Sequence, residues 1–324
     1  MCSSDLVSAD PMAAEMEQVD QVIRERLASQ VVLINQISHY IISAGGKRIR
    51  PALVLLMANA WGYRGTEHHK LAAVIEFIHT ATLLHDDVVD ESDLRRGRQT
   101  ANALFGNAAS VLVGDFVYSR AFQMMVSVQN MRVMQILADA TNVIAEGEVL
   151  QLMNMHDPEV TEERYLQVIR SKTAKLFEAA TALGSLIAGA SEESIASASE
   201  YGRSLGTAFQ LIDDVLDYSG NAADIGKNVG DDLREGKPTL PLIYMLQHGS
   251  EKQRALVRAC ITTGDEANFD EILFAITRSG ALEYTRQKAE MASRQAVSAI
   301  ASMPEGLNKD ALLELAAFAV HRNH

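Results

Sequence analysis

The sequence has few cysteines and few prolines. Only Cys2 and Cys260 occur among 324 residues, which argues against a disulfide framework and predicts a reducing, cytoplasmic location. Six prolines and little β-branched alternation leave most of the chain open to helix formation. The first twenty residues are acidic and lack a basic start followed by an apolar core, so they do not read as a secretory signal.

Basic charge and long apolar runs are also lacking. The formal net charge of −13 argues against non-specific binding of nucleic acid, which needs a basic surface. The longest nearly apolar run, AATALGSLIAGA at 179–190, is too short to span a bilayer. Its small residues instead predict a buried and closely packed helix, and no transmembrane segment is expected.

Apolar residues recur with the period of an α-helix along almost the whole chain, as at Leu71, Val74, Ile75 and Ile78. No linker and no low-complexity segment interrupts the pattern. We therefore predict about a dozen helices in one all-α domain over residues 1–324, in which 1–30 form a helical segment without motifs. The longest irregular stretch, 220–237, contains four glycines, and loops of this length in compact helical domains tend to be functional.

Two aspartate clusters stand at the ends of apolar helical runs. The first is DDVVD at 86–90, and the second is DDVLD at 213–217. At about 5 Å and an effective dielectric constant near 20, each close pair of carboxylates costs roughly 3 kcal/mol. Negative charge at the C-terminal end of a helix also opposes the helix dipole. A cation that neutralises these clusters is therefore a better explanation than a solvated surface.

Helical geometry makes this prediction more specific. Residues i and i+4 share a helix face, so Asp86 and Asp90 point together and Asp87 lies on the flank. In the second cluster one face carries Gln210, Asp214 and Asp217, with Asp213 beside it. Hard oxygen ligands select Mg²⁺, Mn²⁺ or Ca²⁺, and the calcium-loop pattern is absent. Mg²⁺ usually combines one or two carboxylates with substrate phosphates, which suits two such helices facing each other.

Cationic residues alternate with the acidic clusters. GGKRIRP at 45–51 places Lys47, Arg48 and Arg50 after two glycines, which let the backbone approach a ligand, and arginine binds phosphate through two hydrogen bonds. This segment lacks the glycine spacing of a nucleotide P-loop. Other candidate phosphate-binding residues are Arg95, Arg96, Lys172, Thr173, Lys227 and Lys237. Together they favour a site for more than one diphosphate.

Six segments resemble the motifs of the trans-isoprenyl (polyprenyl) diphosphate synthase family, in the same order. They are GGKRIRP, EFIHTATLLHDDVVDESDLRRG, GNAASVLVGDF, SKTAKLFE, GTAFQLIDDVLDY and GKNVGDDLREGKPTLP. The resemblance extends from about Ile34 to Met245 and is strongest to bacterial octaprenyl diphosphate synthases. It implies an all-α isoprenoid synthase fold, with helices around a deep central cavity, and a homodimer.

The resemblance also assigns roles to residues. The Mg²⁺ ligands would be Asp86, Asp90 and Asp213, supported by Asp87, Asp214 and Asp217. The diphosphate of the allylic substrate would be held by Arg95, Lys172, Thr173, Gln210, Lys227 and Lys237. The diphosphate of isopentenyl diphosphate would be held by Lys47, Arg50, His79 and Arg96. The residues expected to be catalytic are Asp86, Asp90, Lys172, Asp213 and Lys227.

The implied reaction condenses an allylic diphosphate, such as farnesyl diphosphate, with successive isopentenyl diphosphates by Mg²⁺-assisted ionisation. In the family, bulky residues about one turn before the first aspartate cluster close the product tunnel. Here those positions hold the small residues Ala81 and Thr82, so an open tunnel and a product of eight or nine isoprene units, for a quinone side chain, are expected. Transient membrane contact during product release is compatible with this function.

Four alternatives remain at this point. The first is a shorter-chain synthase that makes farnesyl or geranylgeranyl diphosphate. The second is a non-catalytic subunit of a heteromeric synthase, which should have lost aspartates or basic residues, although none is lost here. The third is a terpene cyclase, which does not need the segment at 45–51 as a second diphosphate site. The fourth is a structural metal-binding protein, which explains the acidic residues but not the arginines.

Overall fold

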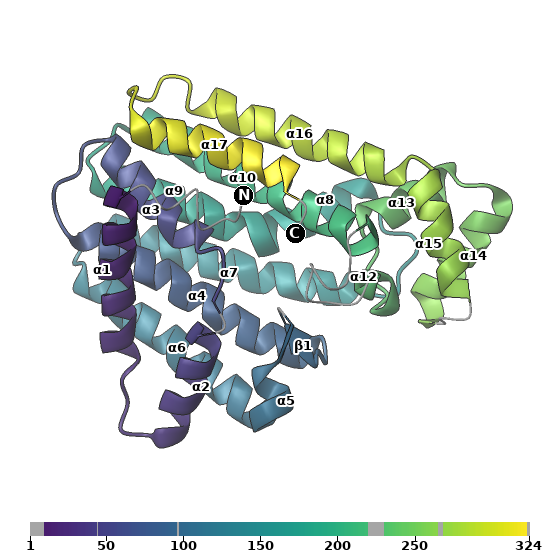
Figure 1. Ribbon diagram of the computed structural model, residues 1–324, viewed down its shortest axis with the longest axis horizontal. Helices are drawn as coiled ribbons and strands as arrows, with labels where there is room; N and C mark the ends of the chain where they lie inside the picture. The colour runs from purple at the N-terminus through teal and green to yellow at the C-terminus, as the bar shows by residue number, and fades with distance from the viewer. Residues whose placement is uncertain (1–9, 44, 96, 220–229, 265–267, 323–324) are drawn as a thin grey trace. The chain divides into compact units, whose positions relative to one another are not determined.

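The computed structural model describes residues 10–43, 45–95, 97–219, 230–264 and 268–322, which are overwhelmingly α-helical (Figure 1). The predicted all-α class is confirmed. The helices are α1 (Asp10–Leu27), α2 (Val32–Ser43), α3 (Ile49–Ala60), α4 (Glu67–Val89), α5 (Ala101–Phe105), α6 (Asn107–Ser127), α7 (Met131–Asn154), α8 (Glu162–Ile169), the π-helical turn η1 (Arg170–Ala174), α9 (Lys175–Ile187), α10 (Glu192–Ser219), α12 (Asp231–Arg234), α13 (Leu240–His248), α14 (Glu251–Thr263), α15 (Phe269–Arg278), α16 (Ala281–Ala299) and α17 (Leu307–His321).

The chain divides into two compact units. Unit 1 comprises Met1–Thr141, Leu176–Gly202 and Ala299–Leu315, and unit 2 comprises Asn142–Lys175, Arg203–Ser298 and Ala316–His324. The first aspartate cluster therefore belongs to unit 1 and the second to unit 2. Each unit is described by itself below.

Helix α4 is the centre of unit 1, where it packs against α1, α3 and α6. The side chains that carry its helical period are fully buried, and they include Leu71, Val74, Ile75 and Ile78. Burying such a side chain contributes roughly 1.5–3 kcal/mol. The stripe predicted from the sequence therefore forms the hydrophobic core that fixes α4, and with it the aspartates at its end.

The predicted close packing of the small-residue run is confirmed for its first seven residues, whereas the helix α9 ends at Ile187 and residues 186–190 are less buried. Its residues from Ala179 to Ser185 are buried, and Gly184 lies directly against α3. A Cβ atom on Gly184 would stand 2.5 Å from the carbonyl oxygen of Val54. Real Cβ atoms do not approach so closely, so only glycine allows this contact between the two helices.

The core of unit 2 consists of two clusters. In one, residues of α13, α14 and α15 pack together, among them Leu242, Ile261 and Ile276. In the other, Tyr165 of α8 and Ile243 of α13 pack against the apolar face of α10. This hydrophobic cluster fixes the C-terminal half of α10, which carries the second aspartate cluster.

Two segments differ from the sequence-based expectation. The break at 95–98 is a two-stranded hairpin, in which β1 (Leu94–Arg95) pairs antiparallel with β2 (Arg98–Gln99) around Gly97. In the predicted loop at 220–237, residues 220–229 lie outside the described residues, but Asp231–Arg234 form the short helix α12. Strands of two residues and a helix of one turn are too short to show a period in the sequence.

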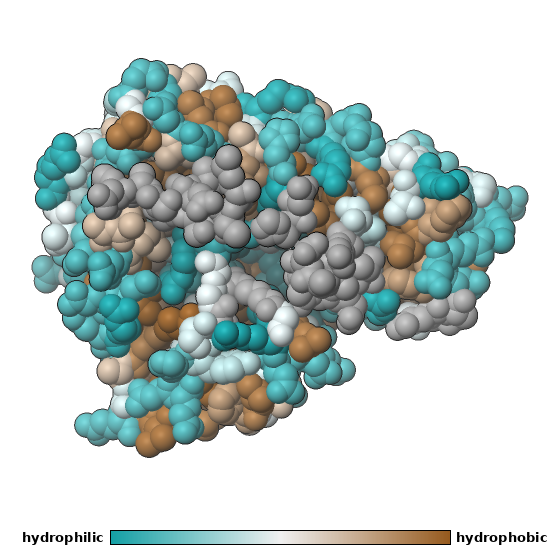
Figure 2. All heavy atoms as spheres, in the orientation of Figure 1, coloured by the Kyte–Doolittle hydropathy of each residue, from teal (hydrophilic) through white to brown (hydrophobic). Residues whose placement is uncertain are grey.

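Hydrophilic residues cover much of the face drawn in Figure 2, and hydrophobic residues appear between them in small groups. Among the described residues, every helix is either too short or too polar to cross a bilayer.

Candidate active site

The first aspartate cluster lies at the C-terminal end of α4. The helix extends to Val89, and the backbone N–H of Asp90 still donates to the carbonyl oxygen of Asp86 at 2.8 Å. Helical geometry therefore holds across the cluster, so Asp86 and Asp90 lie one turn apart on the same face, as predicted. Both are half-buried, whereas Asp87 is completely buried.

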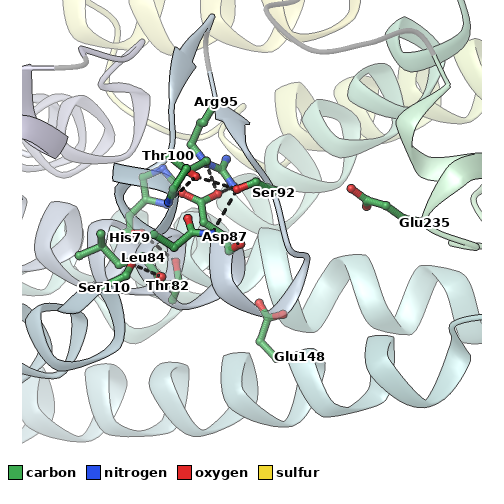
Figure 3. Close-up of polar contacts among 12 residues, drawn as sticks. His79, Thr82, Leu84, Asp87, Ser92, Arg95, Thr100, Ser110, Glu148 and Glu235 are labelled. Atoms are coloured by element: carbon green, nitrogen blue, oxygen red, sulfur yellow. Dashed lines mark hydrogen bonds and ion pairs between the residues drawn. The ribbon is translucent and has the colours of Figure 1, made fainter. Parts of the chain in front are cut away.

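Asp87 forms a buried ion pair with Arg95 of the hairpin. Arg95 Nε donates to Asp87 Oδ1 at 2.7 Å, and Arg95 Nη2 lies 2.6 Å from the same oxygen (Figure 3). The turn between them is fixed by two hydrogen bonds to backbone oxygens. Ser92 N donates to Asp87 O at 2.9 Å, and Thr100 Oγ1 donates to Ser92 O at 2.7 Å. The resemblance assigned Arg95 to the diphosphate of the allylic substrate. In the structure Arg95 pairs with Asp87 of the first cluster, and its contact with a substrate stays a prediction.

A pocket in unit 1 adjoins this ion pair. Its walls come from α2, the turn before α3, α4 and the hairpin, and they include Tyr40, Arg48, Glu76, His79 and Arg95. Arg48 Nη1 is paired with Glu76 Oε1 at 3.3 Å. Arg48 was named among the cations of the GGKRIRP motif, but it was not assigned to either substrate. Cationic groups in a pocket beside carboxylates suit an anion that binds next to a metal.

Two residues predicted to bind isopentenyl diphosphate are brought together. Arg50 Nη1 donates to His79 Nε2 at 3.2 Å, and the Arg50 guanidinium lies 4.5 Å from the centre of the Phe177 ring. The turn before α3 has left-handed backbone at Gly45 and Arg48, with φ of 70° and 50°. The third predicted residue, Lys47, lies in this turn and is half-buried.

The second cluster, on α10, is held by a hydrogen-bond network. Asp214 is buried and accepts hydrogen bonds from the Tyr165 hydroxyl and from Gln210 Nε2, the latter at 2.9 Å. Gln210 Oε1 in turn accepts from Thr173 Oγ1 at 3.0 Å. The predicted residues Thr173, Gln210 and Asp214 are thus brought together. Tyr165 was missed, because nothing near it in the sequence distinguishes it from a core tyrosine.

Burial and like charge raise the pKa values of the carboxyls in this cluster. Burial, followed by the charge of Asp232, raises the pKa of Asp214 well above its ordinary value. The same two causes, burial first, raise the pKa of Asp217 to about 9. A divalent cation would offset this repulsion, and a set of carboxylate oxygens is the donor set that Mg²⁺ prefers. The residues present therefore fit a hard divalent metal ion.

Asp213, the first residue of the second cluster, is partly open to solvent. Its side chain is 42% exposed, although Arg322 Nη2 donates to its Oδ1 at 2.6 Å. The Arg322 guanidinium also donates to Phe209 O at 2.5 Å and lies 3.7 Å from the centre of the Phe209 ring. Sequence reasoning missed Arg322 because it lies far outside the motifs.

Lys172 lies in the π-helical turn η1, and such turns often occur at functional sites. Its Nζ pairs with Glu148 Oε2 at 2.6 Å. A Cβ atom on Gly147 would stand 2.8 Å from the backbone N of Lys172, so glycine is required for the approach of α7 to this turn. The other predicted lysine of unit 2, Lys237, pairs with Glu235 Oε2 at 2.5 Å.

The remaining predicted residues form two groups. Arg96 and Lys227 lie outside the described residues. Ala81 is completely buried on α4, and Thr82 is half-buried with its Oγ1 donating to His79 O at 2.8 Å. The predicted facing of the two aspartate clusters concerns residues of different units and stays a prediction.

Comparison with known proteins adds independent observations. A family model described as "Polyprenyl synthetase" matches residues 31–276. The chain is 55% identical over 312 residues to octaprenyl diphosphate synthase of Escherichia coli (strain K12), and the alignment covers 96% of this chain and 97% of the relative. It is 45% identical over 315 residues to all-trans-nonaprenyl-diphosphate synthase (geranyl-diphosphate specific) of Rhodobacter capsulatus, and the alignment covers 96% of both chains.

A solved structure is similar over almost the whole chain. It is a polyprenyl synthase from Caulobacter crescentus CB15, crystallised with calcium and isoprenyl diphosphate. The TM-score is 0.95 at 44% sequence identity, and the match covers 99% of this chain and 98% of the other. The isoprenoid synthase fold expected from the sequence is therefore confirmed.

Proposed function

The chain belongs to the polyprenyl synthetase family, and from that premise we propose that it is a long-chain all-trans-polyprenyl diphosphate synthase. It extends an allylic diphosphate such as farnesyl diphosphate with successive isopentenyl diphosphates. The observation that carries the proposal is the pair of aspartate clusters at the ends of core helices, each accompanied by lysine or arginine side chains. A synthase of eight or nine isoprene units agrees with the names of the relatives at 55% and 45% identity.

The metal proposed is Mg²⁺, in more than one copy, and Mn²⁺ is an acceptable substitute. Asp86 and Asp90 would bind it in unit 1 and Asp213 in unit 2, supported by the neighbouring acids. When bound, Mg²⁺ neutralises the charge that develops on a departing diphosphate. The chain's own residues then do the positioning, because lysine and arginine donors fix the phosphate oxygens where negative charge increases.

The basic residues divide between the two diphosphates. For the allylic substrate the proposed residues are Arg95, Lys172, Thr173, Gln210, Lys227 and Lys237. For isopentenyl diphosphate they are Lys47, Arg50, His79 and Arg96. Since Arg50 donates to His79, the imidazole acts as a hydrogen-bonding partner within an anion site and not as a general base. The proton lost after each condensation passes to the released diphosphate.

Small side chains at Ala81 and Thr82 support a long product, because they leave room for a prenyl chain that lengthens past α4. Each methylene buried along an apolar wall contributes about 0.8 kcal/mol. A deep tunnel therefore retains the intermediate until it reaches the far end. The product serves as the side chain of an isoprenoid quinone, and release of such an apolar chain involves transient membrane contact.

The proposed working state is a cytoplasmic homodimer in which residues 1–324 act as one polyprenyl synthase domain. Exposed apolar side chains on α6 and at the start of α7 support a partner surface, namely Leu112, Val126 and Met131 at 68%, 60% and 80% exposure. Light scattering on the purified chain tests this state. Leu112→Glu should produce monomers, and an unchanged mass for this variant would move the interface elsewhere.

The activity is tested with purified protein, farnesyl diphosphate, labelled isopentenyl diphosphate and Mg²⁺, followed by chromatography of the products. We expect products of about forty carbons, corresponding to eight units. Asp86→Asn and Asp213→Asn should each lose most of the activity, whereas Asp139→Asn, an exposed carboxylate on α7, should not. Absence of elongation would overturn the enzyme assignment. A product that stops at fifteen or twenty carbons would support the shorter-chain alternative.

A further inference from the structure

We propose that Glu15, His68 and His69 bind a divalent transition-metal ion of the zinc class, at a site separate from the aspartate clusters. The three side chains come from α1 and from the first turn of α4, both in unit 1. Their ligand atoms all lie within 4.8 Å of one another. His68 Nε2 is 2.9 Å from Glu15 Oε2, and His69 Nε2 contacts the same oxygen.

The donor set selects the metal. Two imidazole nitrogens and one carboxylate oxygen are a common protein ligand set for Zn²⁺, with the fourth position left to water. Nitrogen donors favour Zn²⁺ and its transition-metal neighbours over Mg²⁺, which prefers oxygen. A tetrahedral ion with bonds near 2.0–2.1 Å spaces its ligand atoms about 3.4 Å apart. The observed separations require only small side-chain shifts to reach that value.

In the metal-free arrangement two histidines share one carboxylate oxygen. His68 Nε2 and His69 Nε2 both approach Glu15 Oε2, which accepts a hydrogen bond from each. His68 is only 3% exposed, with its ring edge-on to Tyr63 and 4.0 Å from the ring of His69. A metal ion between the three groups would give each of them a ligand bond of its own in place of the shared acceptor.

The site also has a structural consequence. Asp20, on the same helix as Glu15, pairs with Arg48 at 3.5 Å, and Arg48 lines the pocket beside His79. A metal that fixes α1 on α4 therefore fixes one of the two carboxylates that orient Arg48. The ion acts as a structural clamp for the N-terminal helix, and it takes no part in the prenyl transfer proposed above.

The test uses the full chain, stripped of metal with a chelator and then kept in excess Mg²⁺ so that the aspartate clusters are occupied. Co²⁺ is titrated as the probe, because four-coordinate Co²⁺ with nitrogen ligands gives intense visible absorption bands, whereas an all-oxygen, six-coordinate site gives only weak ones. We expect one equivalent of Co²⁺ to bind, and Zn²⁺ to displace it. Glu15→Gln and His69→Gln should each weaken binding at least tenfold.

Glu17→Gln is the matched control, since Glu17 is an exposed carboxylate on the same helix and does not contact the histidines. Its titration should coincide with that of the unaltered protein. Circular dichroism checks that each variant is folded. If a variant does not fold, the Co²⁺ titration of the unaltered chain still tests whether the site binds a metal. No stoichiometric Co²⁺ band in the unaltered chain, or equal Co²⁺ affinity in His69→Gln, would overturn the proposal. Prenyl transfer is not the readout, so this result is independent of the proposed function.

Discussion

Replacing Tyr165 by phenylalanine tests whether the second aspartate cluster is positioned from α8. The Tyr165 hydroxyl donates to Asp214, and both side chains are buried. Removal of this donor costs about 1–3 kcal/mol, because it leaves a buried carboxyl oxygen without its hydrogen bond. Gln210 still donates to the other oxygen at 2.9 Å, so the network is weakened and not abolished.

Two measurable effects should follow from Tyr165→Phe. The free energy of unfolding should fall by about 2 kcal/mol, as determined by urea denaturation. The Mg²⁺ concentration for half-maximal prenyl transfer should rise about three- to tenfold. Without the Tyr165 hydroxyl the buried carboxyl of Asp214 fixes the end of α10 less firmly, so that Asp213, the proposed metal ligand beside it, is less well positioned.

Tyr284→Phe is the matched control, because the Tyr284 hydroxyl donates to Glu162 Oε2 at 2.7 Å and contacts no aspartate of the cluster. This bond is partly exposed, so its loss should cost less than about 1 kcal/mol and should not change the Mg²⁺ requirement. If the two variants have the same stability and the same Mg²⁺ dependence, Tyr165 does not position Asp214 and the reasoning is wrong.

Three further outcomes are expected. Ala81→Tyr should shorten the product. Ala73→Tyr, at an equally buried position on α4, should lower the free energy of unfolding by about 1–3 kcal/mol without shortening the product. An unchanged product length for Ala81→Tyr would show that Ala81 does not border the tunnel. Gly147→Ala should lower kcat about tenfold in steady-state kinetics, since a Cβ would stand 2.8 Å from the backbone N of Lys172, and an unchanged kcat would contradict this role. The pKa of Asp217 is raised from 3.8 to about 9, so the folded metal-free protein binds a proton at Asp217 that the unfolded chain has lost. Its free energy of unfolding should therefore fall as the pH rises from 5 to 9. Urea denaturation of Asp217→Asn should lack this part of the fall, and an identical pH dependence in the two proteins would contradict the prediction.

The parts of the site that could be predicted from the sequence depend on local helical geometry. The apolar stripe of α4 and the spacing of Asp86 and Asp90 follow from a period of 3.6 residues, which needs no knowledge of the rest of the chain. The same argument placed Gln210 and Asp214 on one face, where they now share a hydrogen bond. Motif resemblance then assigned chemistry to these positions.

The parts that could not be predicted depend on long-range contacts. Tyr165 contacts Asp214 from 49 residues away, and Arg322 contacts Asp213 from 109 residues away. Neither tyrosine nor arginine at such a distance carries a signal of its partner in a single sequence. The π-helical turn around Lys172 was missed for another reason, since one extra residue in a helical turn hardly changes the apolar period.

The two clusters are built alike, and this explains why each begins with two aspartates. The second aspartate of each pair, Asp87 or Asp214, is buried and bonded to a side chain from another element, Arg95 or Tyr165. The first of each pair is more open, and Asp213 is 42% exposed even beside its arginine. A buried carboxylate with fixed partners cannot easily turn toward an incoming ion, because it would leave those partners unsatisfied. The buried aspartate therefore anchors the end of its helix, and the more open Asp86 and Asp213 are the ones that would bind the proposed metal ion.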